Sequence, residues 1–161
     1  MPLDIVPAAK KKPVLLPGDR FDAVVVGAGF AGYWNRYPGA RCDIESMQYS
    51  FQFSEELQQE WTWSERYASQ PELLAYIEHV ADRFDLARDI QFDTRVEGAE
   101  FDGDANEWVV RTDAGQAVRA RYFILGSGCL SAASVPHFEG YDDFKGPIYH
   151  TGHWPHGGVD F

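Results

Sequence analysis

Cysteine, basic residues and long apolar runs are all scarce in this chain of 161 residues. Its two cysteines, Cys42 and Cys129, form no C-x-x-C pair, and such sparse use of cysteine is typical of a reducing compartment. No apolar run approaches the length of a membrane span, and prolines and lysines interrupt residues 1–20, which excludes a signal-peptide core. We therefore expect a cytoplasmic protein without a membrane partner.

The shortage of basic residues makes the chain strongly acidic. Lys and Arg number 14 against 25 Asp and Glu, which gives a net charge of −11. An acidic surface repels phosphate backbones and anionic lipids, so nucleic acid is excluded as a main partner. The one basic run, Lys10 to Lys12, lies in the proline-rich segment 1–20, which we expect to be a flexible N-terminal arm.

Aromatic residues, by contrast, are abundant at 15% and gather in the segments 33–67 and 138–161. Core packing accounts for such clusters, and so does a planar ligand or a domain interface, so both interpretations stay open. For Trp61 and Trp63 we expect packing.

The hydrophobic pattern predicts an α/β domain that contains a β-meander. Residues 22–26 form a valine-rich run that ends in glycine, which is typical of a buried strand in a parallel sheet. The segment 69–86 has one apolar face and begins with the capping box Ser69–Glu72, so it predicts a helix. The other expected elements are a strand at 47–53, a short helix at 55–61, and meander strands at 90–102, 107–113 and 116–128. This order fits half of a doubly wound nucleotide-binding domain.

The glycines after the first strand carry the G-x-G-x-x-G signature of a dinucleotide site. Gly27 permits a tight turn, Gly29 lets the backbone approach a pyrophosphate, and Gly32 allows a helix to pack closely on the strand. That helix supplies N–H groups to the phosphates. Pro38 and Gly39 break any helix at this point, so we expect an incomplete doubly wound, Rossmann-like domain.

Two motifs give the chain a family resemblance. The stretch FKGPIYHTGHWP fits the fingerprint F-x-G-x-x-x-H-x-x-x-W-P at all its fixed positions, which are Phe144, Gly146, His150, Trp154 and Pro155. The second half of another fingerprint, G-G-x-W-x-x-x-x-[YF]-P-G-x-x-x-D, is matched by Tyr37, Pro38, Gly39 and Asp43. From Asp22 onward the chain resembles the N-terminal FAD-binding part of the Baeyer–Villiger-type flavin monooxygenases.

The resemblance implies a gap and a domain plan. The family's first helix, its second strand and the G-G-x-W turn have no counterpart between Gly32 and Tyr33. The implied plan is a partial FAD-binding domain at 21–140 and a linker at 141–161 that carries the first fingerprint. The family's NADPH domain would follow Phe161 and is absent from the chain.

The resemblance also implies how the cofactors would be held. The FAD pyrophosphate would lie over Gly27, Gly29 and Gly32, and Gly126 would lie near the phosphates. Tyr33, Trp34 and Tyr49 would lie at the flavin, and the Val96 backbone would bind the adenine. Arg41 and Cys42 would line the approach of the nicotinamide cofactor.

Two residues have an implied role nearer to the chemistry. Asp43 would orient a catalytic arginine that belongs to the missing part, and His150 would couple the motions of the two nucleotide domains. The alternative for Asp43 is a carboxylate that caps a turn. The spacing of His150, His153 and His156 also suits a metal ion, but the fingerprint explains His150 without one, so we expect no metal site.

The implied activity is an FAD- and NADPH-dependent monooxygenase that uses O₂ to convert a ketone into an ester or lactone. We expect this chain to be an incomplete and inactive part of such an enzyme. One alternative is a non-catalytic module that binds a nucleotide or a partner, with self-association through exposed strand edges. The other is a flavin monooxygenase that oxidises sulfides or amines.

Overall fold

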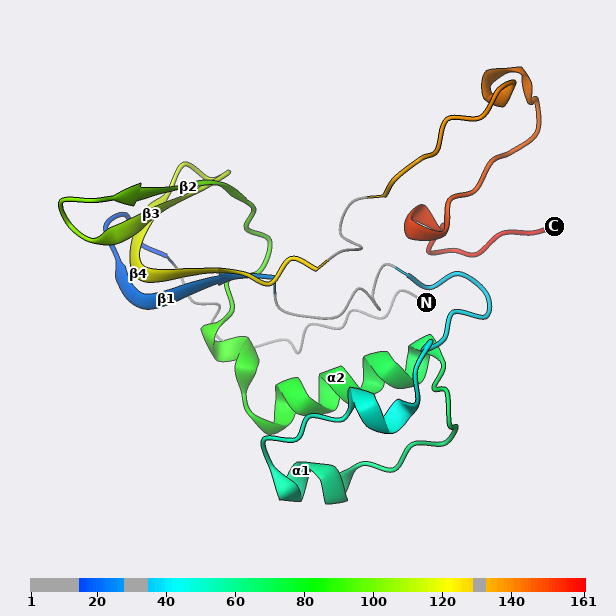
Figure 1. Cartoon of the computed structure of the whole chain (residues 1–161), viewed down its shortest axis with the longest axis horizontal. Helices are drawn as coiled ribbons and strands as arrows, with labels where there is room; N and C mark the ends of the chain where they lie inside the picture. Colours follow the sequence, from blue (N-terminus) through cyan, green and yellow to red (C-terminus); the bar gives the residue numbers. More distant parts are fainter. Residues whose placement is uncertain (1–14, 28–34, 129–132) are drawn as a thin grey trace. The chain divides into compact units, whose positions relative to one another are not determined.

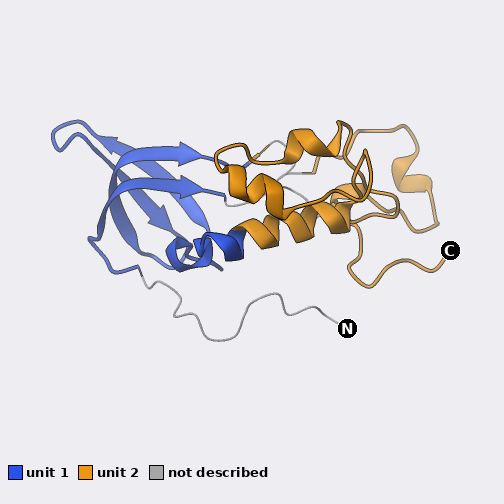
Figure 2. Cartoon of the chain, turned by 90° about the horizontal axis from the view of Figure 1, so that it is seen from below, with its two compact units in different colours: residues 1–28, 81–127 blue, residues 29–80, 128–161 orange. Residues whose placement is uncertain are grey.

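A computed structural model of the chain describes residues 15–27, 35–128 and 133–161. The chain divides into two compact units, Met1–Ala28 with Ala81–Ser127 and Gly29–Val80 with Gly128–Phe161 (Figure 2). We call them unit 1 and unit 2 and describe each by itself. The division into an arm, a partial FAD-binding domain and a linker stays a prediction.

Unit 1 contains a four-stranded mixed sheet. Its strands are β1 (Arg20–Val26), β2 (Val96–Asp102), β3 (Glu107–Thr112) and β4 (Ala117–Leu125). They lie in the order β1-β4-β3-β2 (Figure 1), with β1 parallel to β4 and both other pairs antiparallel. The expected α/β class and the β-meander are therefore confirmed. The last strand of the meander returns beside the first strand of the chain.

Two tight turns produce this meander. In the first, the Asp102 carboxylate accepts a hydrogen bond of 3.1 Å from the Ala105 N–H, and Asn106 has a φ of 54°. In the second, Gly115 has a φ of 73°, and its N–H donates to the Thr112 carbonyl at 2.9 Å. Asn and Gly adopt this left-handed conformation at low cost, so these two residues determine where the chain turns.

The burial expected for the first strand is wrong. Val110, Thr112, Val118 and Ala120 are the buried residues of β3 and β4. Val25 on β1 is 57% exposed, however, and Leu125 at the end of β4 is 67% exposed. A valine-rich strand becomes buried only when other elements close both of its faces. The described part of the chain does not close them.

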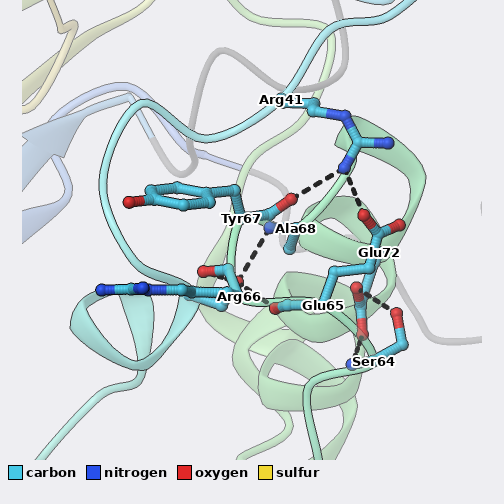
Figure 3. Close-up of polar contacts among 8 residues, drawn as sticks. Arg41, Ser64, Glu65, Arg66, Tyr67, Ala68 and Glu72 are labelled. Atoms are coloured by element: carbon cyan, nitrogen blue, oxygen red, sulfur yellow. Dashed lines mark hydrogen bonds and ion pairs between the residues drawn. The ribbon is translucent and has the colours of Figure 1, made fainter.

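Unit 2 holds the helices α1 (Glu55–Glu60) and α2 (Gln70–Arg83), the latter extending three residues into unit 1. The Ser54 side chain caps α1 by accepting from the Leu57 N–H at 3.2 Å, and Leu57 is fully buried. The expected capping box of α2 differs, since the Glu72 carboxylate accepts from the backbone N–H and the hydroxyl of Ser64 (Figure 3). Short 3₁₀ turns complete the fold: η2 (Ser46–Tyr49), η3 (Leu86–Asp89), η4 (Tyr141–Asp143) and η5 (Thr151–His153).

The strand expected at 47–53 is wrong. Its start belongs to η2, where Gln48 donates to the Glu45 carbonyl at 2.9 Å. The alternation of apolar residues is misleading here because Met47 is 69% and Phe53 is 64% exposed, so no apolar face is buried. Local turn hydrogen bonds therefore replace strand pairing.

Aromatic side chains form the core of unit 2. Tyr76 on α2 is 1% exposed, and its ring lies 5.3 Å from that of Trp61, 5.0 Å from that of Trp63 and 6.0 Å from that of Phe51. The Tyr76 hydroxyl accepts from the Phe51 N–H at 2.8 Å, and the Trp63 ring donates to Ser50. Trp61 and Trp63 are packing residues, as expected. Among the described residues, no helix is long and apolar enough to cross a membrane.

Candidate functional site

The described part of the glycine signature is the turn at the end of β1. Gly27 has a φ of 96°, and a Cβ placed on it would meet the Gly126 carbonyl oxygen at 2.4 Å. The Gly126 N–H donates to the Val26 carbonyl at 2.7 Å, so the chain after β4 passes directly against this turn. Gly29, Gly32, Tyr33 and Trp34 lie outside the described residues.

This turn lies where the carboxyl ends of two parallel strands meet. Val26 pairs with Leu125, the last residue of β4. In open α/β sheets, ligands bind outside the carboxyl ends of the strands. The Gly126 backbone fills the space that a Cβ on Gly27 would need, so the two glycines bring the ends of β1 and β4 close together.

Val96, the expected adenine contact, is the first residue of β2. It pairs with Thr112 on β3, and the register shifts between Val96 and Gly98. Next to it, the Asp113 N–H donates to the Arg95 carbonyl at 2.9 Å. Val96 is half-buried, in the same unit as Gly27.

A second group of expected site residues lies in unit 2. Asp43 follows directly after Cys42, whose N–H donates to the Ala68 carbonyl at 2.9 Å. The Tyr49 hydroxyl donates to the Asp43 carboxylate at 3.2 Å, and that carboxylate is exposed. Burial raises the pKa of Tyr49, and the negative charge of Asp43 raises it further. The structure thus brings Asp43 and Tyr49 together.

Arg41 and Cys42 stand in different surroundings. Arg41 donates to the Tyr67 carbonyl at 2.9 Å and forms an ion pair with Glu65 (Figure 3). Its side chain is 47% exposed. Cys42 is 7% exposed, and burial raises the pKa of its thiol. Arg41 therefore faces solvent with a carboxylate partner, whereas the Cys42 side chain points into the unit.

The fingerprint at 144–155 is held together by local contacts. A Cβ on Gly146 would lie 2.6 Å from the Phe144 ring, so the small residue makes room for that ring. The Trp154 ring lies 5.7 Å from the Tyr149 ring and 6.1 Å from the Phe161 ring. The F-x-G spacing thus has a packing reason within the segment itself.

His150 uses both of its ring nitrogens. Nδ1 accepts from the Gly152 N–H at 3.0 Å, and Nε2 lies 3.1 Å from the Ser134 carbonyl. A carbonyl only accepts, so this contact is a hydrogen bond when Nε2 carries the proton. Gly152 fits closely against the ring, since a Cβ there would be 3.3 Å from Nδ1. Sequence reasoning missed Ser134, because no local signal links residues sixteen positions apart.

The described residues contain no group of three or more His, Cys, Asp and Glu side chains that could hold a metal ion. The His150 and His153 rings lie 5.5 Å apart, and His150 is engaged by Gly152 and Ser134.

The chain is similar to several monooxygenases among known proteins. No family model matches. A Baeyer–Villiger monooxygenase of Pseudooceanicola batsensis is 44% identical over 87% of this chain and 31% of its own length. Phenazine N-monooxygenase PhzNO1 of Lysobacter antibioticus is 39% identical over 84% of this chain and 30% of its own length. The crystal structure of cyclohexanone monooxygenase from Rhodococcus sp. Phi1 bound to NADP⁺ is 40% identical, covers 88% of this chain and 32% of its own, and has a TM-score of 0.79.

The alignments also bear on the expected gap. The one with the Pseudooceanicola protein runs over 168 residues, more than the whole chain contains, although it covers only 87% of the chain. That relative therefore holds residues without a counterpart here. The chain spans about a third of the length of the curated relatives that it matches.

Proposed function

The chain is homologous to one part of the Baeyer–Villiger monooxygenases, and from this premise we propose that it is part of the FAD-binding domain of such an enzyme. The proposed fold is an incomplete doubly wound, Rossmann-like domain. The observation that carries the proposal is the turn at Gly27, which Gly126 approaches so closely that no Cβ fits. The parallel strands β1 and β4 meet at this turn.

The residues at this turn fit the pyrophosphate of FAD. Gly27 and Gly126 would lie against it through their backbones, because the missing Cβ of Gly27 lets the ends of β1 and β4 pack closely where ligands bind to such sheets. Gly29 and Gly32 would complete the contact, with Tyr33, Trp34 and Tyr49 at the flavin and Val96 at the adenine. When bound, FAD supplies the redox chemistry, with NADPH as the source of electrons and O₂ as the oxidant.

Asp43 is the proposed functional carboxylate of unit 2. One of its oxygens accepts from Tyr49, and the exposed carboxylate can accept further donors. A carboxylate of this kind holds an arginine through a charge-assisted pair of fixed geometry. We propose that Asp43 orients the catalytic arginine of the enzyme and that Arg41 and Cys42 lie on the nicotinamide side.

His150 is proposed as a coupling residue in the linker 141–161. Its two hydrogen bonds join the Ser134 carbonyl to the turn at Gly152. A ring held at both nitrogens ties these two segments together, which suits a role in coupling domain motions.

Ketones are the proposed substrate class. A second candidate class is amines and related nitrogen heterocycles, because a relative that is 39% identical is named a phenazine N-monooxygenase. The products are an ester or lactone from a ketone and an N-oxide from a nitrogen heterocycle.

A chimaeric enzyme tests both candidates. In the Pseudooceanicola relative, residues 20–27 and 35–161 of this chain would replace their aligned counterparts, so that both sides of the Gly27–Gly126 turn come from this chain and the relative supplies the remaining parts. We expect NADPH consumption that depends on cyclohexanone and yields the lactone. Turnover with phenazine but not with ketones would favour N-oxidation. A folded chimaera that oxidises neither class would overturn the proposal, whereas the chain alone is expected to be inactive.

A further inference from the structure

The segment that carries Asp43 pairs with residues 66–70 in an antiparallel manner and then departs from that pairing. Arg41 pairs with Ser69, and the Gln70 N–H donates to the Ala40 carbonyl at 2.9 Å. The Cys42 N–H donates to the Ala68 carbonyl at 2.9 Å, which keeps the same register.

The next contact has slipped by two residues. The Ser46 N–H, not that of residue 44, donates to the Arg66 carbonyl at 2.8 Å. Residues 43–45, which we call the Asp43 loop, therefore bulge out between two anchored positions. The residues on either side of the loop, Cys42 and Ser46, are bonded to the carbonyls of Ala68 and Arg66, which are only two residues apart.

This slip changes the partner of the Ala68 N–H. In a regular antiparallel pair that N–H would donate to the Cys42 carbonyl, because paired residues exchange both bonds. Here it donates to the Ser46 hydroxyl at 2.8 Å. The same hydroxyl lies 2.8 Å from the Glu65 carbonyl and 3.0 Å from the Arg66 carbonyl, so its single proton is also used.

Ser46 is suited to this task by its burial. It is 2% exposed, and Ala68 is fully buried, so water does not replace the hydroxyl if it is removed. A buried N–H without an acceptor is costly. The other side-chain links between the two segments are the ion pairs Arg66–Glu45 and Arg41–Glu65 and the hydrogen bond from Arg41 to the Tyr67 carbonyl. The four side chains of the ion pairs are all at least 43% exposed, so solvent screens these pairs.

We propose that Ser46 is the positioning residue of this site: its buried hydroxyl closes the Asp43 loop and so holds the Asp43 carboxylate against Tyr49. The catalytic meaning of that carboxylate rests on the proposed function. The positioning itself does not, because it is a property of the folded chain without any cofactor.

The ionisation of Tyr49 reports on the position of Asp43. The negative charge of Asp43 contributes to the raised pKa of Tyr49, so a displaced carboxylate lets Tyr49 ionise at lower pH. Tyrosinate absorbance of the whole chain would be followed against pH, with Tyr49→Phe to identify the signal. Asp43→Asn gives the shift that corresponds to complete loss of the charge.

We expect Ser46→Ala to shift the Tyr49 titration to lower pH by at least half of the Asp43→Asn shift, and Ser46→Thr to restore it. Ser54→Ala is the matched control, because it removes the cap of α1 and costs stability without touching the Asp43 loop. It should leave the Tyr49 titration unchanged. A folded Ser46→Ala chain with the titration of the unmodified chain would overturn the proposal.

A second measurement covers the case in which Ser46→Ala does not fold. Amide hydrogen exchange on the unmodified chain should show the N–H groups of Cys42, Ser46 and Ala68 protected to the same degree, as one unit. Rapid exchange at Ala68 beside a protected Cys42 would contradict the proposal. Neither measurement needs FAD, so failure to bind FAD would count against the proposed function alone.

Discussion

Gly27 shows how a single residue is fixed by its surroundings. The residue combines a φ of 96° with a backbone neighbour 2.4 Å from where a Cβ would lie. The sequence predicts the first requirement, because a glycine after a valine-rich strand marks a tight turn. The sequence does not predict the close neighbour. That neighbour is Gly126, which is distant in the chain and reaches the turn only because β4 pairs with β1.

A substitution separates these two requirements. Gly27→Ala adds a clash with the Gly126 carbonyl to the cost of a positive φ, so we expect a loss of about 2–4 kcal/mol in the free energy of unfolding. Gly18→Ala is the control, because Gly18 has a φ of 91° and nothing within 4 Å of the added carbon. It should lose only about 1 kcal/mol. Urea unfolding measures both, and equal losses would show that Gly126 does not approach the turn.

Other site residues were visible in the sequence only as a motif. Phe144, Gly146 and His150 match a fingerprint, but their contacts are evident only in three dimensions. Gly146 makes room for the Phe144 ring, and His150 bonds to Ser134 and Gly152. Ser46 gave no signal at all, because a serine in a loop is ordinary and the importance of this one comes from the segment that pairs with it.

The elements that the sequence predicts well are those stabilised locally. The helices α1 and α2 and the strands β3 and β4 begin and end within three residues of where periodicity and turn residues put them. The strand β2 begins at Val96, six residues after the expected start at residue 90. The strand expected at 47–53 fails because its alternating residues bury no face. The pairing of residues 40–46 with 66–70 was beyond prediction, since neither segment has a strand pattern.

The turn between β2 and β3 has a testable dependence on pH. The Ala105 N–H, and then Arg119, lower the pKa of Asp102. A carboxyl whose pKa is lower in the folded chain stabilises the fold above its unfolded pKa, near 3.9. That contribution is lost as pH falls through the lower, folded value.

The free energy of unfolding therefore falls on acidification below about pH 4, in part because Asp102 becomes protonated. In Asp102→Asn this part of the fall should be missing. The Asn side chain can still accept from the Ala105 N–H, so the turn itself is kept. Glu97→Gln, on the same strand, removes a carboxyl group outside this turn and serves as the control. Thermal melts of the whole chain by circular dichroism between pH 2 and 7 measure the effect. Identical acid limbs for the unmodified chain and Asp102→Asn would contradict the assignment.

At the scale of the whole molecule, exposed apolar surface on the sheet of unit 1 predicts association. β1 is an edge strand of the described sheet, and Val25, Tyr122, Ile124 and Leu125 are all at least 50% exposed. An edge strand with apolar neighbours is a template for pairing with another chain. We expect the molar mass from size-exclusion chromatography with light scattering to rise with concentration. A constant monomer mass over a hundredfold range would contradict this, and a charged substitution, Val25→Lys, should reduce association.

We propose that this chain is a part of an FAD-binding domain that lacks a segment after Gly32. The most direct test places the unmatched residues of the Pseudooceanicola relative between Gly32 and Tyr33, and records visible absorbance after incubation with FAD and gel filtration. We predict that the restored chain retains the flavin bands and that the unmodified chain retains much less. Gly27→Ala in the restored chain should lose them again. A restored chain that folds and stays colourless, or an unmodified chain that retains FAD equally well, would contradict the account.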